Sequence, residues 1–432
     1  MNLVLLAHPL FLGLRSQDHF ARMLAEAFAA RGHRVTVRRP VPRARAWAGE
    51  GRLAKWAGYV DQYLLFPRQL RRAMRRDPPD TLYVVCDQAL GPWVPLVAAR
   101  PHVVHCHDLL ALQSAQGDWP QNPVSITGRK YQRWIRRGFS RARHFVSISH
   151  HTRTELHRLT GLQALTSEVV HLGLNHPYAP MHADEARACL RQAGLPVPEG
   201  PVLLHVGGGQ WYKNSVGVVA LYCHHVLAAV QAGQQPLALW MVSPPPGPAL
   251  QALLAQVPAA GRVQFIHGVS PDALQALYGL AAALLFPSLA EGFGWPILEA
   301  MACGCAVFTT GEAPMTEVGG EVAHYLPRLH ADDALEAWAA DAARHVTQCL
   351  QASAAERQAR ALAGVRRAAG FQAATAIEAY LGLYRQILAL EGQAGEAAGE
   401  AAGEAAGGAA GGAAGRAPNG PASRHEAVER LG

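Results

Sequence analysis

The sequence predicts an α/β protein built from two Rossmann-like, doubly wound domains. Its 432 residues exceed what one ordinary core holds, because domains typically have about 100 to 200 residues. Short apolar runs alternate with longer helical patterns, which is typical of parallel sheets covered by helices. A segment dense in proline and glycine interrupts this alternation once, so two domains joined by one linker are the simplest interpretation.

The first domain is predicted over residues 1–180. An apolar run at its start predicts a buried strand, and the amphipathic segment that follows predicts a helix closed by Gly32. Further short apolar runs continue the series. The strands are expected at residues 3–7, 34–37, 82–86, 102–105 and 144–148, and the first helix at 18–31.

The linker is predicted at residues 181–200 and the second domain at 201–370. A helix over 371–390 closes the folded part of the chain. Residues 391–432 are mostly Gly, Ala and Glu, and without large apolar side chains we expect them to be disordered, with a transient alanine-rich helix as the alternative. The strands of the second domain are expected at 202–206, 237–242, 263–266, 281–286 and 306–308.

Charge is unevenly distributed along the chain. Residues 1–190 contain 26 Lys/Arg and 13 Asp/Glu, a net charge of +13, whereas the remainder contains 13 and 19, a net charge of −6. Such a basic half attracts phosphorylated acceptors, an anionic membrane surface or nucleic acid. The alternative is that the arginines only cover solvated helices, and the scarcity of lysine favours this.

Cysteine usage and the N-terminus indicate a cellular location. The seven cysteines are scattered and lack the paired spacing of a disulfide scaffold or a structural zinc site. The chain begins without the basic start and apolar length of a secretory signal, and no apolar run reaches the roughly 18 to 20 residues of a spanning helix. We therefore expect a cytoplasmic protein, with attachment to the inner face of the membrane as the alternative.

The strongest functional signal follows the strand predicted at 281–286 and has the sequence Glu-Gly-Phe-Gly-Trp-Pro, residues 291–296. Ligands of open α/β sheets bind outside the carboxyl ends of strands. Pro296 suits the first turn of a helix, so the preceding N–H groups are free to bind an anion at its positive end. Glu291 and Glu299 would then accept from sugar hydroxyls. The alternative is a plain turn with solvated glutamates.

Together with Pro287-Ser288 before it and residues 299–304 after it, this run resembles the two-glutamate motif of retaining glycosyltransferase family 4. The resemblance covers roughly residues 1–388 and implies the GT-B fold. In that fold the first domain lies on the acceptor side of a cleft and the second on the nucleotide-sugar side. The helix at 371–390 would pack back on the first domain.

The resemblance also implies roles for individual residues. Glu291 would act on the transferred sugar as a catalytic residue, and Glu299 would accept from the ribose hydroxyls. Glu317 stands where the family often has another acid. The donor's phosphates or sugar would be held by Gly292, Phe293, Gly294 and Trp295.

A second match begins the second domain, where glycines 207–209 and Lys213 lie between a strand and a helix. Glycines let the backbone approach a phosphate, and a lysine supplies charge against a departing diphosphate. The resemblance makes Lys213 that catalytic cation, with Gly209 and Asn214 in the substrate site. Many family members have an arginine where this chain has Gly208, so backbone N–H groups or another arginine would have to assist. A plain turn is the alternative.

The first domain contributes His105-Cys106-His107-Asp108 at the end of a strand. The resemblance places His107 near the donor sugar as a catalytic residue, oriented by Asp108; a buried structural histidine and a metal cluster are the alternatives. Ser16 follows the first strand, near the donor phosphate and acceptor. Val269 lies in a segment that usually borders the nucleobase.

The predicted function is retaining transfer of a hexose-type sugar from a nucleoside diphosphate sugar to a hydroxyl acceptor, in cell-envelope or surface-polysaccharide synthesis. No cofactor and no metal are expected, since no Asp-x-Asp is present. The predicted partners are the donor, a saccharide or lipid-linked acceptor, and an anionic membrane touched by the basic domain, without nucleic acid. The alternatives are a catalytically weak nucleotide-sugar-binding subunit and a basic nucleic-acid-binding protein.

Overall fold

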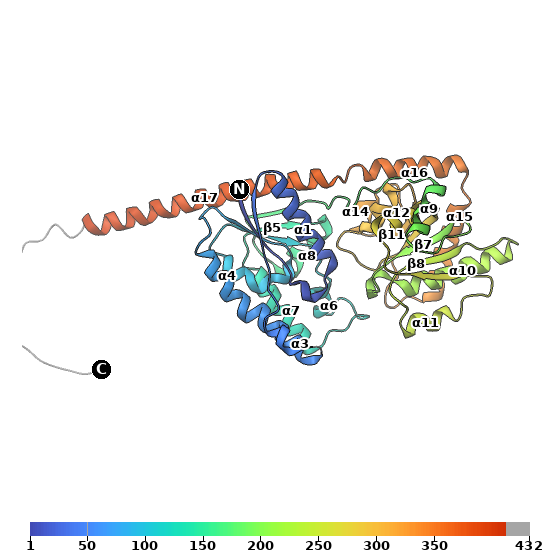
Figure 1. The fold of residues 1–432 in the computed structure, drawn as a ribbon, viewed down its shortest axis with the longest axis horizontal. Coiled ribbons are helices and arrows are strands. Elements are labelled where there is room, and N and C mark those ends of the chain that lie inside the picture. The colour runs from blue at the N-terminus through green and yellow to red at the C-terminus, as the bar shows by residue number, and fades with distance from the viewer. Residues whose placement is uncertain (50, 412–432) are drawn as a thin grey trace, which may run out of the picture.

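Two six-stranded parallel sheets form the framework of the protein, as the computed structural model of residues 1–49 and 51–411 shows (Figure 1). The strand orders are β2-β1-β3-β4-β5-β6 and β12-β11-β10-β7-β8-β9. All pairings are parallel. The predicted fold class, two doubly wound α/β domains of the GT-B type, is confirmed.

The first sheet is buried on both faces. Along β1 (Asn2–Leu6), Leu3 and Leu5 belong to one apolar core, whereas Val4 and Leu6 belong to another. Since side chains alternate across a strand, helices must cover both faces. The other elements of this part are α1 (Arg15–Ala30), β2 (Arg34–Arg38), α2 (Ala44–Ala48), α3 (Arg52–Val60), η2 (Asp61–Leu65), α4 (Phe66–Met74), β3 (Leu82–Val85), η3 (Gln88–Trp93), α5 (Val94–Val97), β4 (His102–Cys106), α6 (Leu110–Gln116), α7 (Ile126–Phe139), β5 (His144–Ser147), α8 (His150–Thr160) and β6 (Thr166–Val169).

The second sheet follows α9 (Ala183–Gln192), which lies within the predicted linker. Ala186 and Leu190 of α9 are fully buried in the same core as Leu277 of α12, so this helix packs on the second domain. The remaining elements are β7 (Val202–Val206), η4 (Trp211–Lys213), α10 (Ser215–Gln231), β8 (Ala238–Val242), α11 (Pro248–Leu254), β9 (Val263–Ile266), α12 (Pro271–Leu280), β10 (Ala281–Phe286), α13 (Trp295–Ala302), β11 (Ala306–Thr310), α14 (Met315–Gly319), β12 (His324–Leu326), α15 (Leu335–Leu350) and α16 (Ala354–Ala368).

The last helix, α17 (Ala373–Gly411), returns from the second domain and runs along the first (Figure 1). The buried Tyr384 packs edge-on against Phe28 of α1, with ring centroids 5.6 Å apart, and its hydroxyl lies 2.6 Å from His105 Nε2. Tyr380 and Ile387 are buried in the same core. The C-terminal helix therefore completes the core of the first domain.

This helix extends beyond residue 390, where we expected disorder to begin. Over residues 391–411 the structure has the alanine-rich helix that was the alternative. Glu391 accepts from Arg143 at 2.6 Å and from His144 at 2.8 Å, which fastens this part of the helix to the start of β5. The high helix propensity of alanine supports the following turns. The rest of the expected disordered segment, residues 412–432, lies outside the described residues.

Within residues 1–49 and 51–411, none of the helices combines the length and apolar character needed to cross a membrane. All seven cysteines are free thiols.

Candidate active site between the two domains

An ion pair between Lys213 and Glu291 lies at the carboxyl edge of the second sheet. Lys213 follows β7 and Glu291 follows the neighbouring strand β10, and their Nζ and Oε1 atoms are 2.7 Å apart. Only 13% and 8% of the two side chains are exposed. Lys213 Nζ also lies 4.6 Å from the ring centroid of Phe286. Two of the three predicted catalytic residues therefore form an ion pair. Removal of either residue would leave the charge of the other buried and unpaired.

Asn214 connects the loops that carry this ion pair. It has a left-handed conformation (φ 55°) and caps α10 by accepting from Gly217 N at 3.1 Å. Its amide donates to Pro287 O at 3.0 Å. Because both polar groups of this buried side chain have protein partners, Asn214 positions the two loops, whereas we predicted that it contacts substrate.

The glycine loop before Lys213 favours glycine at position 209. Gly209 has φ 78°, which disfavours any side chain there. The atoms nearest to a Cβ at position 208 belong to the flexible side chain of Gln210, 2.7 Å away, so an arginine there would require Gln210 to move.

Gly292 brings the two domains into direct contact. A Cβ atom at this position would collide with the backbone oxygen of His107. The carbonyl oxygen of Gly292 accepts from Ser149 Oγ at 2.8 Å and from Thr152 Oγ1 at 3.3 Å, both in the first domain. The loop that carries Glu291 thus lies against the strand ends that carry His107 and Asp108.

His107 is a buried, uncharged imidazole. Its Nε2 lies 2.8 Å from the carbonyl oxygen of Cys86, a geometry in which Nε2–H donates and Nδ1 keeps its lone pair. The ring of Phe20 packs edge-on against it at 4.5 Å. Burial lowers the pKa of His107 below its ordinary value. Among the described residues no hydrogen bond joins Asp108 to His107, so the Cys86 carbonyl has the orienting role that we predicted for Asp108.

Asp108 is a half-buried carboxyl close to the ion pair. Its Oδ1 accepts from Leu110 N at 3.1 Å. Burial, and then the negative charge of Asp87, raises the pKa of Asp108 to about 6, and Glu291 adds to this effect. The carboxyl therefore ionises close to neutral pH.

Glu299 lies on the buried face of α13. Its two oxygens accept from Tyr278 Oη at 3.0 Å and from Asn175 Nδ2 at 3.2 Å. Burial raises the pKa of this carboxyl. Each carboxylate oxygen has a second lone pair, so acceptance from a ligand hydroxyl is compatible with these bonds.

Phe293 and Trp295 hold the loop through their side chains. Phe293 is buried against His171 and Phe371, and Trp295 Nε1 donates to Gly173 O at 3.0 Å. The N–H groups of residues 292–295 have no acceptor within the described chain. An anion at the start of α13 would therefore meet backbone donors, not these side chains.

Ser16 and Val269 make no polar contact with this cluster within the described residues. Ser16 is exposed in the first turn of α1, and Val269 is half-buried after β9 and packs on the core. No hydrogen bond in the described part of the chain links either residue to the ion pair.

Two further contacts between the domains escaped the sequence analysis. Glu317 accepts from the backbone N–H groups of His150 and His151 at 2.8 and 2.7 Å, and so caps α8 of the other domain. The guanidinium of Arg328 lies 4.6 Å from the ring centroid of Trp119, also across the domain boundary. The sequence contains one signal that could have indicated these contacts: Glu317 and Arg328 each come shortly after a strand, β11 and β12.

Two domains that meet along the carboxyl edges of their sheets define a protein of the GT-B class. Residues 18–176 match the family described as Glycosyltransferase Family 4, and residues 200–348 match Glycosyl transferases group 1. The chain belongs to this glycosyltransferase family 4/group 1 family.

Individual relatives are distant. The O-antigen chain mannosyltransferase B of Escherichia coli is 27% identical over 193 residues, which cover 45% of this chain and 50% of that protein. The 2-deoxystreptamine glucosyltransferase of Streptomyces kanamyceticus is 27% identical over 259 residues, 57% of this chain and 64% of that protein. The chain thus spans about half the length of the mannosyltransferase it matches.

Two solved structures share the fold. Sucrose-phosphate synthase of Thermosynechococcus elongatus superposes with a TM-score of 0.65 and 20% identity, covering 90% of this chain and 100% of that one. HepE of Anabaena, in complex with UDP and glucose, superposes with a TM-score of 0.64 and 15% identity, covering 89% and 100%.

Replacing Gly292 with alanine is expected to push the domains apart, because the new Cβ would collide with the His107 backbone. We expect a loss of about 1–3 kcal/mol in the free energy of unfolding and a larger radius of gyration. Small-angle X-ray scattering and urea denaturation measure the two effects. Gly200→Ala is the matched control, since open space surrounds Gly200. An unchanged radius and stability for Gly292→Ala would show that the contact is not formed in solution.

Replacing Asp108 with asparagine is expected to stabilise the protein above about pH 4 and not below it. The folded-state pKa of about 6 lies above the ordinary 3.8, so ionisation of Asp108 opposes folding. This penalty is absent below about pH 4, grows as the pH rises, and is complete above about pH 6. Asp108→Asn should therefore gain up to about 3 kcal/mol over the wild type at pH 8 and nothing at pH 4.

Urea denaturation at both pH values tests this, with the exposed Asp332→Asn as the control. An equal gain at pH 4 and pH 8 would assign the effect to packing and contradict the raised pKa.

Proposed function

We propose that the protein is a retaining glycosyltransferase that moves a hexose-type sugar from a nucleoside diphosphate sugar to a hydroxyl acceptor. The observation that carries this proposal is the buried Lys213–Glu291 pair, held against His107 and Asp108 of the facing domain. A cation for phosphate and an acceptor for sugar hydroxyls lie side by side, next to the free N–H groups that begin α13.

In the proposed reaction, the bond between the anomeric carbon and the diphosphate oxygen breaks while the acceptor oxygen bonds to the same face of that carbon. The acceptor's proton passes to an oxygen of the departing diphosphate. Lys213 and the N–H groups of residues 292–295 stabilise the charge that develops on the diphosphate. Glu291 holds the sugar through its hydroxyls, and the domain contact at Gly292 limits the access of water.

His107 would contribute as a neutral group beside the sugar. Its unprotonated Nδ1 accepts a hydrogen bond, and burial disfavours a charge on the ring. Glu299 would accept from the ribose. Lys213 pairs with Glu291 within the protein, so a carboxylate compensates the charge of this mostly buried cation.

The chain's relatives support a role in surface-glycan synthesis. One is an O-antigen chain mannosyltransferase and another a glucosyltransferase, both of which use hexoses. We therefore include mannose and glucose, on each common nucleoside diphosphate, in the first donor screen.

The acceptor is proposed to be a saccharide, presented on a lipid at an anionic membrane. Several large apolar side chains of α2, α3 and η2 are strongly exposed: Trp47 by 93%, Leu53 by 73% and Trp56 by 68%. Leu53 and Trp56, with Val60 and Leu64, border a hollow of about 570 Å³. Arginines supply positive charge from α4, which follows in the chain, and from α7, whose Tyr131 packs against Tyr59 and Tyr63. Apolar insertion beside basic residues is what an anionic bilayer binds.

A catalytically weak nucleotide-sugar-binding subunit is the second candidate, and Gly208 favours it. Without an arginine there, Lys213 is the sole cation that we assign to the diphosphate. A Cβ at position 208 meets the flexible Gln210 side chain, which can move aside, so Gly208→Arg discriminates the two candidates: a weak subunit should gain turnover from the added cation.

Removal of either member of the ion pair is expected to abolish most activity. Glu291→Gln and Lys213→Ala should each lower turnover of the preferred donor by about 10²- to 10³-fold, since each takes away a preorganised transition-state contact. The double variant should lose less than the product of the two factors, because the residues act on each other. Donor hydrolysis and transfer, followed by nucleotide release, measure this.

Lys130→Ala and Glu336→Gln are the matched controls. They remove one positive and one negative charge from exposed positions outside the site, and they should leave turnover unchanged. If Glu291→Gln turns over donor as fast as the wild type, the enzyme assignment fails and the binding-subunit candidate replaces it.

The exposed aromatic face is expected to bind membranes. Replacing Trp47 and Trp56 with alanine should weaken binding to vesicles that contain anionic lipid by about tenfold per residue, because each buries a large apolar surface in the bilayer. Co-sedimentation measures the affinity. Leu362→Ala, a solvent-facing apolar residue of α16, should have no effect. Failure of the wild type to sediment with anionic vesicles would remove the membrane proposal.

A further inference from the structure

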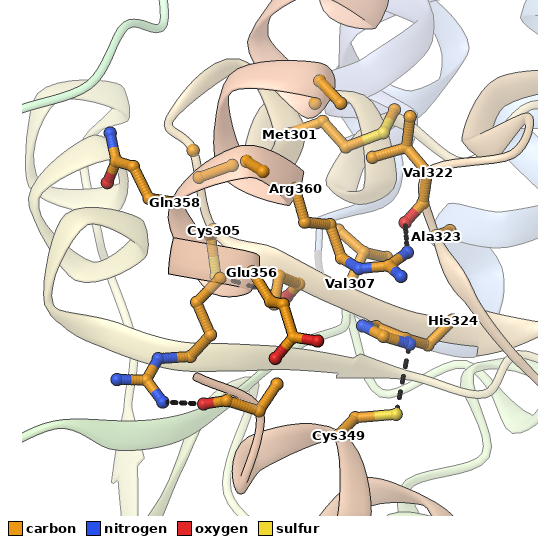
Figure 2. A pocket seen from close by; sticks show the side chains of 18 of the residues that line it. Met301, Cys305, Val307, Val322, Ala323, His324, Cys349, Glu356, Gln358 and Arg360 are labelled. Carbon is orange, nitrogen blue, oxygen red and sulfur yellow. Dashed lines mark hydrogen bonds between the residues drawn. The ribbon is translucent and has the colours of Figure 1, made fainter. Parts of the chain in front are cut away.

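A cavity of about 830 Å³ lies at the amino ends of β10, β11 and β12, the edge of the second sheet opposite to Lys213 and Glu291. Figure 2 shows side chains of β11, β12 and α16 directed into it, with His324 and Cys349 next to each other. Nothing in the proposed sugar transfer uses this cavity.

Three side chains with metal-binding atoms converge at the rim of the cavity. Cys349 Sγ lies 3.2 Å from His324 Nδ1 and 3.9 Å from His345 Nε2. All three ligand atoms lie within 4.8 Å of one another. His345 and Cys349 are four residues apart on α15 and so share one face of that helix, and His324 begins the neighbouring strand β12.

The spacing of these atoms fits a tetrahedral zinc ion. With Zn–S of about 2.3 Å and Zn–N of about 2.05 Å, tetrahedral angles separate a sulfur from a nitrogen ligand by about 3.6 Å. The two observed sulfur–nitrogen distances fall on either side of this value. Each sulfur–nitrogen distance would have to change by only a few tenths of an ångström to hold an ion, and the two imidazole nitrogens lie within 4.8 Å of each other.

The surrounding residues hold the imidazoles in place. Phe308 pairs with His324 across the sheet, and their rings stack with centroids 4.6 Å apart and an interplanar angle of 15°. The same Phe308 ring packs edge-on against His345 at 6.1 Å. The three ligands thus come from a helix and a strand that share one buried aromatic support.

We propose that His324, His345 and Cys349 form a zinc-binding site, with a fourth coordination position that opens into the cavity. Two imidazoles and one thiolate favour zinc over magnesium or calcium, which prefer oxygen ligands. His324 and Cys349 both line the cavity, so water or a small anionic ligand completes the shell. The ion would tie the edge strand β12 to α15.

A second group of metal-binding side chains, His150, His171 and Glu317, is the main competitor for zinc. Glu317 already caps α8 through two backbone N–H groups, so its carboxylate has a structural role without an ion. A His171→Ala variant therefore separates this cluster from the proposed site.

The test is metal titration of the full-length, reduced and chelator-treated protein, with Co²⁺ as the spectroscopic probe and Zn²⁺ as the competitor. The wild type is expected to bind one Co²⁺ with a thiolate-to-cobalt charge-transfer absorption, which Zn²⁺ then removes. Zn²⁺ should also raise the melting temperature, since it binds only the folded chain, whereas Mg²⁺ should not.

Cys349→Ser should lose the charge-transfer absorption, and His345→Ala should bind Zn²⁺ at least about tenfold more weakly. Cys223→Ser, a partly exposed cysteine outside the cluster, and His171→Ala should behave as the wild type does. Absence of the absorption in the wild type, or its persistence in Cys349→Ser, would overturn the proposal. Because the wild-type titration can overturn it by itself, the test holds even if a variant does not fold.

Discussion

The contact between Gly292 and the backbone of His107 sets the distance between the two domains. Any side chain at position 292 would hold the sheets apart, and the carbonyl of the same residue accepts from Ser149 and Thr152. This loop also carries Glu291. The close approach of the two domains therefore also fixes where the Lys213–Glu291 ion pair lies. Glu317, which caps α8 from the opposite domain, supports the same arrangement.

The acids around this contact each have a hydrogen-bond donor inside the protein: Asp87 has His8, Asp108 has Leu110 N, Glu291 has Lys213, and Glu299 has Tyr278 and Asn175. Lys213 compensates the charge of Glu291, whereas burial raises the pKa of Asp108 and of Glu299. The N–H groups at the start of α13 add a positive field for an anion.

Sequence alone predicted five of the six strands in each sheet and the catalytic-edge loops, because apolar periodicity and glycine-rich strand ends are local signals; the short edge strands β6 and β12 were missed. The predicted site also included both Lys213 and Glu291, although not their ion pair. Contacts between residues distant in the chain were not predicted. Asn214 and His107 are held by Pro287 and Cys86, and the helix beyond residue 390 is held by Arg143 and His144. The His324–His345–Cys349 group escaped because its third ligand comes from a separate strand, so no compact spacing indicates it.

The return of α17 to the first domain also determines the order in which the chain can fold. His105 and Tyr384, which meet in one core, are separated by 279 residues. During synthesis the first domain leaves the ribosome long before the helix that covers Phe20 and Phe28 exists. The apolar surface of the first domain stays uncovered until the second domain has been made, so loss of the last helix would destabilise the half of the chain that is made first.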